Sequence, residues 1–97
     1  MRALDSLTAA DFAPHVHERF RLQAGAAGEL AAELVEVAGG DGGERGRPFI
    51  LVFLGPRDPV LPQRIYGIGH PELGALQVFL VPIGRDAAGV RYEAVFN

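Results

Sequence analysis

The second half of the chain constrains the fold most, because short apolar runs alternate there with turns rich in Gly and Pro. Residues 49–54 and 75–83 are apolar on both faces of an extended segment, with only Gln77 interrupting the second run. Residues 63–70 and 90–97 instead alternate apolar and polar side chains, as half-buried strands do. Short connections favour antiparallel neighbours. We therefore predict that residues 48–97 form a β-meander.

A short helix is expected near the start of the chain. Thr8 is suited to the N-cap position, and Asp11 three residues later completes a capping box. Pro14 disfavours helix at the preceding residue. Residues 7–13 are therefore predicted to form about one helical turn.

Three further segments separate this turn from the meander. Residues 17–23 alternate and predict a half-exposed strand. Residues 29–37 fit a helical stripe as well as a strand. The short, Gly-flanked connection to the preceding strand favours a hairpin, so we predict a strand. Residues 39–47 are Gly-rich and predict a flexible surface loop.

The expected architecture is one β-rich domain over residues 1–97. Hydrophobic residues make up 48% of the 97 residues and charged residues 22%, the balance of a globular protein. The class is all-β, or mainly β with one short N-terminal helix: an antiparallel meander that closes into a small barrel or sandwich of about six strands. Each of the two runs that are apolar on both faces has a second apolar face to bury, and three arrangements could do so. They are a closed barrel capped by the N-terminal turn, a two-layer sandwich, or an exposed patch that a partner buries.

Composition excludes several classes of function. Cysteine is absent, so neither disulfides nor thiolate chemistry are available. The net charge is −3 and the arginines form no basic stripe, which argues against nucleic-acid binding. No apolar segment follows Arg2 as in a signal peptide, and the longest apolar run, residues 49–54, is too short to span a membrane. A cytoplasmic location is the default expectation, with export by a signal-independent route left open.

Three histidines, His15, His17 and His70, are the candidates for a metal site. In an extended segment His15 and His17 would point to the same side, and His70 or a carboxylate would supply a third ligand. The alternative is that His15 and His17 are ordinary surface residues and that His70 braces its turn by hydrogen bonding. Two histidines at this spacing arise easily by chance, so we predict neither a metal nor a cofactor.

The sequence supplies little for catalysis, and we predict no catalytic residue. Besides two tyrosines, the hydroxyl nucleophiles are Ser6 and Thr8, both close to the start of the chain. No pair of carboxylates is placed on a shared apolar cleft. A candidate interaction patch is expected where Arg64, Arg91 and Glu93 lie on outward faces of adjacent strands, with Tyr66 beside them. Tyr66 and Tyr92 are themselves expected to be core residues with hydroxyls at the rim.

Several short motifs together resemble one small, uncharacterised bacterial family, known as a domain of unknown function. The resemblance covers nearly the whole chain, and its closing hexapeptide, residues 92–97, is the most specific part. It implies a free-standing domain with no assigned chemistry, associated with genes for phage-tail-collar-like proteins. The family pattern has a small residue where this chain has His17, which counts against a ligand role for that histidine. The motifs are Leu7-Thr8, Asp11-Phe12, Pro48-Phe49, Gly55-Pro56, Leu61-Pro62-Gln63, Tyr66, His70-Pro71-Glu72-Leu73-Gly74, Phe79-Leu80-Val81-Pro82-Ile83-Gly84 and Tyr92-Glu93-Ala94-Val95-Phe96-Asn97.

Three functions remain as hypotheses. The first is a non-enzymatic interaction or structural module that self-associates or docks to a larger protein, through the apolar excess or by accepting a strand at an open sheet edge. The second is a small barrel that carries an apolar ligand near Tyr66, Gly67 and Phe79. The third is an enzyme, which would need His70 beside a carboxylate in a cleft with a perturbed pKa.

Overall fold

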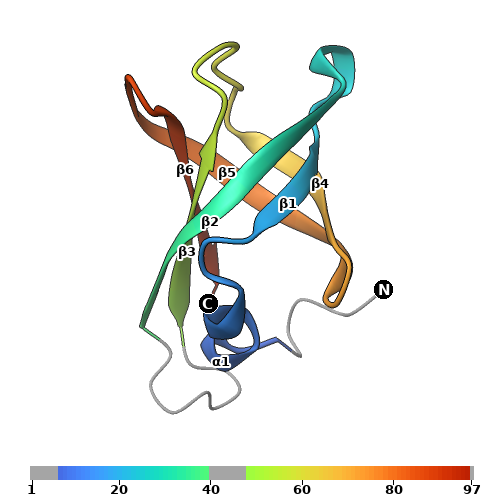
Figure 1. Cartoon of the computed structure of the whole chain (residues 1–97), viewed down its shortest axis with the longest axis vertical. Helices are drawn as coiled ribbons and strands as arrows, with labels where there is room; N and C mark the ends of the chain where they lie inside the picture. The colour runs from blue at the N-terminus through green and yellow to red at the C-terminus, as the bar shows by residue number, and fades with distance from the viewer. Residues whose placement is uncertain (1–6, 40–47, 97) are drawn as a thin grey trace.

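Six antiparallel strands close into a barrel in the computed structural model, which describes residues 7–39 and 48–96 (Figure 1). A short helix α1 and two 3-10 turns, η2 and η3, accompany the strands. The predicted class is confirmed, and the architecture is the barrel rather than the sandwich. None of the helical segments in the described residues is long or apolar enough to cross a membrane. The elements are α1 (Ala9–Phe12), η2 (Ala13–His15), β1 (Arg19–Gln23), η3 (Gly25–Ala27), β2 (Glu29–Gly39), β3 (Phe49–Gly55), β4 (Arg64–His70), β5 (Gly74–Asp86) and β6 (Gly89–Phe96).

The order of strands around the barrel is β1-β2-β3-β6-β5-β4, and pairing of β1 with β4 closes it. Strands β4, β5 and β6 form the predicted meander. Strand β3 pairs with β2 and β6 and not with β4, so the expectation of four successive neighbours within residues 48–97 is wrong for β3. The physical reason is the loop of residues 56–63, because a tight turn would have kept β3 beside β4.

Closure gives each strand a neighbour on both sides. Strand β6 lies between β3 and β5. Pro82 lies opposite Tyr92 inside the β5–β6 ladder, next to a shift in register. Residues 81–86 of β5 pair with β6 alone, since the ladder between β4 and β5 ends at Leu80, so the expectation that an open sheet edge accepts a strand stays a prediction for that segment.

Alternation along the strands determines which side chains fill the barrel. Inward-facing residues of all six strands, together with Phe12, form one buried cluster. Full burial of a Val, Leu, Ile or Phe side chain contributes about 1.5–3 kcal/mol to the free energy of folding. No buried polar side-chain atom in the described part of the chain lacks a hydrogen-bond partner. The largest fully buried side chains are Tyr92, Phe12, Phe20, Phe53, Leu22, Leu34, Leu51, Leu76, Leu80, Val78 and Val90.

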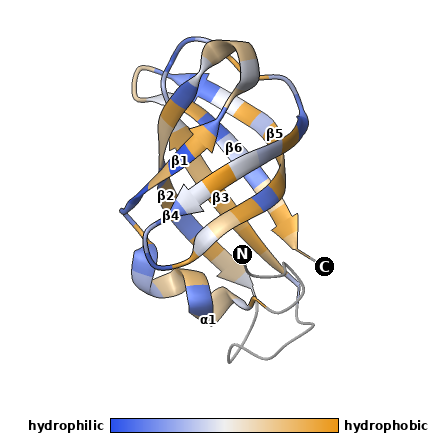
Figure 2. Ribbon diagram, turned by 90° about the vertical axis from the view of Figure 1, so that its right-hand side faces the viewer, coloured by the Kyte–Doolittle hydropathy of each residue, from blue (hydrophilic) through white to orange (hydrophobic). Residues whose placement is uncertain are grey.

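The outer faces of the two doubly apolar strands, β3 and β5, have different environments. Apolar residues follow one another along both strands (orange in Figure 2). On the outer face of β3, Val52 is only 8% exposed and Ile50 is half-buried. On β5, Phe79 is 49% exposed and Ile83 is 50% exposed. The apolar side chains on the outer face of β5 are thus more exposed to solvent than those on the outer face of β3.

The N-terminal segment covers one end of the barrel (Figure 1). Its capping box is present, with the backbone N–H of Thr8 donating to a carboxylate oxygen of Asp11 at 2.8 Å. The ring of Phe12 is completely buried, and its centroid lies 5.9 Å from that of Phe49 and 5.8 Å from that of Phe96. Of the three arrangements considered for the second apolar faces, the structure has the closed barrel capped by the N-terminal turn.

Two tyrosine hydroxyls hold the loop that connects β3 to β4. The backbone N–H of Leu61 donates to the Tyr92 hydroxyl at 3.0 Å, and this bond is buried. The Tyr66 hydroxyl donates to the carbonyl of Pro62 at 2.5 Å. Both rings are buried, so the expectation of core tyrosines with their hydroxyls at the rim is confirmed.

Several segment boundaries differ from the predictions. The ambiguous segment 29–37 is a strand, as predicted, and β2 extends to Gly39. Strand β5 runs to Asp86, beyond the apolar run of residues 75–83, and a turn at Ala87 and Ala88 connects it to β6. Of the predicted flexible loop 39–47, Gly39 belongs to β2 and residues 40–47 lie outside the described residues.

Candidate functional site

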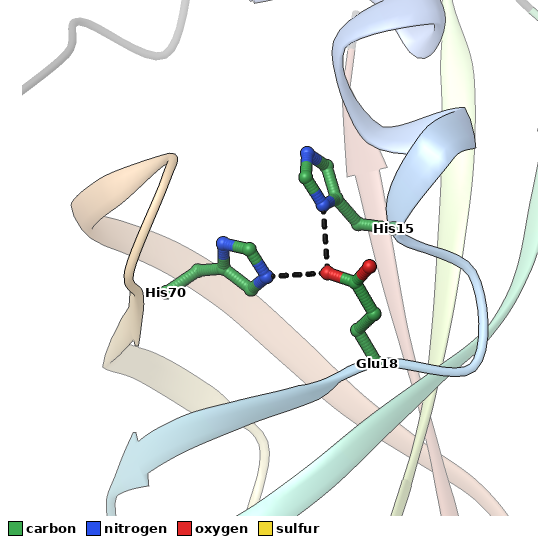
Figure 3. Close-up of side chains that lie close together, drawn as sticks. All are labelled: His15, Glu18 and His70. Atoms are coloured by element: carbon green, nitrogen blue, oxygen red, sulfur yellow. Dashed lines mark hydrogen bonds and ion pairs between the residues drawn. The ribbon is translucent and has the colours of Figure 1, made fainter.

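Two histidines converge on one carboxylate beside the capped end of the barrel. One oxygen of Glu18, Oε1, lies 2.8 Å from His15 Nδ1 and 2.8 Å from His70 Nε2 (Figure 3). The two imidazole rings meet edge to face, with centroids 4.5 Å apart. Both histidines are almost fully buried, at 7% and 4% exposure, whereas the Glu18 side chain is 45% exposed. The site is therefore a buried pair of imidazoles with a carboxylate at the solvent side.

Each member of the cluster is positioned by a different local structure. The 3-10 turn η2 ends at His15, and a β-turn with a positive φ of 75° at His17 follows it, closed by the Glu18 N–H donating to the His15 carbonyl at 3.0 Å, which brings the Glu18 carboxylate back to His15. Glu18 is held by its backbone, since its N–H donates to the carbonyl of His15 and its carbonyl accepts from the N–H of Leu34. His70 is the last residue of β4 and faces inward, with its ring 4.7 Å from that of Phe20.

The hydrogen bonds define which nitrogen of His70 carries the proton. The backbone N–H of Glu72 donates to His70 Nδ1 at 3.1 Å, so Nδ1 is unprotonated. The proton of the neutral ring is therefore on Nε2, which donates to Glu18. His15 donates from Nδ1 to the same carboxylate oxygen, because an ionised carboxylate can only accept. Glu18 thus receives two N–H donors.

This arrangement stabilises the charged form of Glu18. The hydrogen bond from His15, and after it the one from His70, holds the pKa of the Glu18 carboxyl below its ordinary value. The bond from Glu72 to His70 also confirms that His70 braces the turn after β4, which was the structural alternative to a ligand role.

The sequence-based metal candidates are only partly brought together. His15 and His70 meet, but His17 lies apart, 77% exposed and 3.2 Å from a carboxylate oxygen of Glu33. The assumption of an extended segment was wrong, because η2 ends at His15 and His17 has a positive φ of 75°. Glu18 was not identified from the sequence. The spacing of His15 and Glu18 after a proline would have indicated it.

The candidate patch of Arg64, Tyr66, Arg91 and Glu93 does not form one surface. Strand β5 lies between β4 and β6, so Arg64 is not on a strand adjacent to Arg91 and Glu93. Arg91 instead pairs with Asp86 at 2.6 Å. Tyr66 is 4% exposed and lies inside, with the Arg64 guanidinium 5.6 Å from its ring centroid.

The residues proposed to surround an apolar ligand also separate. Tyr66 faces the barrel interior, whereas Phe79 is 49% exposed on the outside. A side chain at Gly67 would meet the exposed Gln23 and Gln77, so that glycine also lies on the outer face. A shallow hollow of about 310 Å³ opens on the surface beside Arg19, Glu33 and Pro56, away from these residues.

The comparisons with known proteins identify a family. Residues 7–96 match the profile of a family described as a domain of unknown function (DUF6916), and that description names no enzymatic activity. Neither a curated protein nor a solved structure matches the chain. Because the matched segment covers nearly the whole chain, this protein belongs to the DUF6916 family.

Proposed function

We propose that the protein is a non-enzymatic interaction module that self-associates through an apolar band on the outside of the barrel. The outer apolar band consists of Ile50, Ile65, Phe79, Val81 and Val95. The observation that carries the proposal is the pair Ile65 and Phe79. They lie directly opposite each other on β4 and β5 and are 61% and 49% exposed.

The band continues onto the neighbouring strands. Val95 on β6 is 52% exposed and lies opposite Ile50 on β3. Val81 on β5 lies opposite Glu93 on β6, and Phe79 and Val95 are each two residues further along, on the same outer face. Single exposed apolar residues are normal on a protein surface, but a row across four adjacent strands is typical of an interaction site.

A second copy of the chain is the occupant that the charges favour. Because every strand of the closed barrel has a neighbour on both sides, the exposed outer face offers association a larger surface than an edge does. In a twofold contact the same face occurs twice, so an unpaired charge on it would meet its own copy. Arg91 on β6 is neutralised within the chain by Asp86, so it would not repel its own copy. Glu93, directly opposite Val81, also lies on this outer face, so the twofold axis must keep the two Glu93 side chains apart.

The oligomeric state tests this proposal. Sedimentation over a concentration series should show a reversible dimer. Val95→Lys and Phe79→Asp should weaken the dimer at least about tenfold, which corresponds to 1.4 kcal/mol. Val60→Lys is the matched control, because Val60 is 46% exposed in the loop before β4 and lies outside the band.

Three results would contradict self-association through this face. They are a strict monomer at every concentration without binding of a hydrophobic dye, a dimer that Val95→Lys leaves intact, and a dimer that Val60→Lys weakens equally. A monomer that binds the dye would also exclude the second copy, and it would direct the search to a different protein partner.

A further inference from the structure

The cluster of His15, Glu18 and His70 has the donor set of a metal site. Its three facing atoms, His15 Nδ1, Glu18 Oε1 and His70 Nε2, all lie within 4.8 Å of one another. We propose that these residues bind a first-row divalent transition-metal ion, with Zn²⁺ as the best-suited example. Two imidazoles and one carboxylate are a ligand set that zinc uses where it keeps a coordination position open for water. The proposal uses different residues from the outer apolar band and does not depend on it.

The three ligand atoms must rearrange to receive the ion: Glu18 Oε1 moves away from both nitrogens, and the two nitrogens, which lie within 4.8 Å of each other, adopt the same spacing. Zinc binds nitrogen and oxygen ligands at about 2.0–2.2 Å, so neighbouring ligand atoms around it are about 3.3 Å apart. The present separations from Glu18 Oε1 to the two nitrogens are 2.8 Å. An increase of about half an ångström is within reach of the Glu18 side chain, because that side chain is 45% exposed.

Two of the three ligands are already ordered. The rings of His15 and His70 are buried and in contact with each other, and His70 also contacts Phe20. Little side-chain freedom would therefore be lost on binding. The exposed Glu18 gives the ion a route from solvent, and water would complete its coordination on that side.

The tautomer of His70 makes the proposal specific. A neutral imidazole that ligates through Nε2 carries its proton on Nδ1, and Nδ1 of His70 now accepts the backbone N–H of Glu72. Metal binding must move that proton from Nε2 to Nδ1 and break the bond to Glu72. In His15 the proton moves from Nδ1 to Nε2, so neither neutral ring gains or loses a proton overall. The turn after β4 should therefore report the bound ion.

The test is titration of the protein with zinc chloride, followed by calorimetry and by amide NMR spectra. His15→Asn and His70→Gln each retain an amide N–H near the position of the nitrogen that faces Glu18, while removing the imidazole ligand. We expect saturable binding of one ion, a shift of the Glu72 amide resonance, and at least a tenfold loss of affinity in each variant. His17→Asn is the control, since His17 lies outside the cluster and asparagine tolerates its positive φ.

Several outcomes would overturn the assignment. The first is the absence of saturable binding up to about 1 mM zinc, which corresponds to only 4.1 kcal/mol of binding free energy. The second is binding that the His15 and His70 variants retain, or that His17→Asn removes. The third is binding without a change at Glu72, which would mean that His70 Nε2 is not a ligand. Thermal melting of each variant checks that it is folded, and the two substitutions test the site independently.

Discussion

Tyr92→Phe tests the proposal that a buried hydroxyl fastens the loop between β3 and β4. The hydroxyl of Tyr92 accepts the backbone N–H of Leu61 at 3.0 Å, and both residues are buried, at 1% and 5% exposure. Phenylalanine preserves the ring but leaves this N–H without its partner. Water cannot readily replace the partner at a buried position, so the donor keeps the full desolvation penalty.

The expected loss of stability is about 1–3 kcal/mol. Tyr66→Phe provides the comparison, because the Tyr66 hydroxyl bonds the next residue of the same loop, Pro62. Pro62 is exposed, so water can replace the lost donor, and the expected cost is only about 0.5–1.5 kcal/mol. In a domain of this size each kcal/mol lowers the melting temperature by about 4–8 °C.

Urea unfolding of both variants and of the unchanged protein measures the difference. The midpoints should decrease in the order unchanged protein, Tyr66→Phe, Tyr92→Phe, with the slope of free energy against urea constant. A Tyr92→Phe variant as stable as the unchanged protein, or more stable than Tyr66→Phe, would refute the reasoning. A changed slope would show that the denatured or native state had altered instead.

Three further predictions concern backbone fit, alkaline stability and the last strand. Gly89→Ala should cost about 2–6 kcal/mol, because the added methyl group would overlap the carbonyl of Gly55 at a positive φ. Gly84→Ala, with open space around it, should change the melting temperature little. Burial raises the pKa of the Tyr66 hydroxyl, so as pH rises the folded state keeps the hydroxyl proton after the unfolded state has lost it. This contribution to stability is complete below pH ~10 and is lost as pH rises through the folded pKa. The free energy of unfolding, measured from pH ~8 to ~11, should therefore decline in the unchanged protein, and Tyr66→Phe should lack this part of the decline. Deletion of residues 92–97 should abolish cooperative melting, because β6 pairs with both β3 and β5, and a truncated chain that still melts cooperatively would refute this.

The candidate site could be predicted only in part from the sequence. His15 and His70 were identified as candidates because imidazoles are few in this chain and suited to ligation. Their meeting was not predictable, since 52 positions separate Glu18 from His70 and only closure of β1 against β4 brings them together. His17 was wrongly grouped with His15, because the local turn after Pro14 replaced the expected extended segment.

The sequence by itself determined β1, β4 and β6, since alternation with a period of two is a local property of neighbouring residues. It also determined the helical turn, through the capping pair Thr8 and Asp11 and the stop at Pro14. Only the tertiary structure decided that β3 lies beside β6, because the proline-containing loop permits either neighbour. It likewise decided that apolar side chains on the outer face of β5 are more exposed than those on the outer face of β3. The exposure of an outward side chain depends on which residues from distant parts of the chain lie around it, and the local alternation of residues does not contain that information.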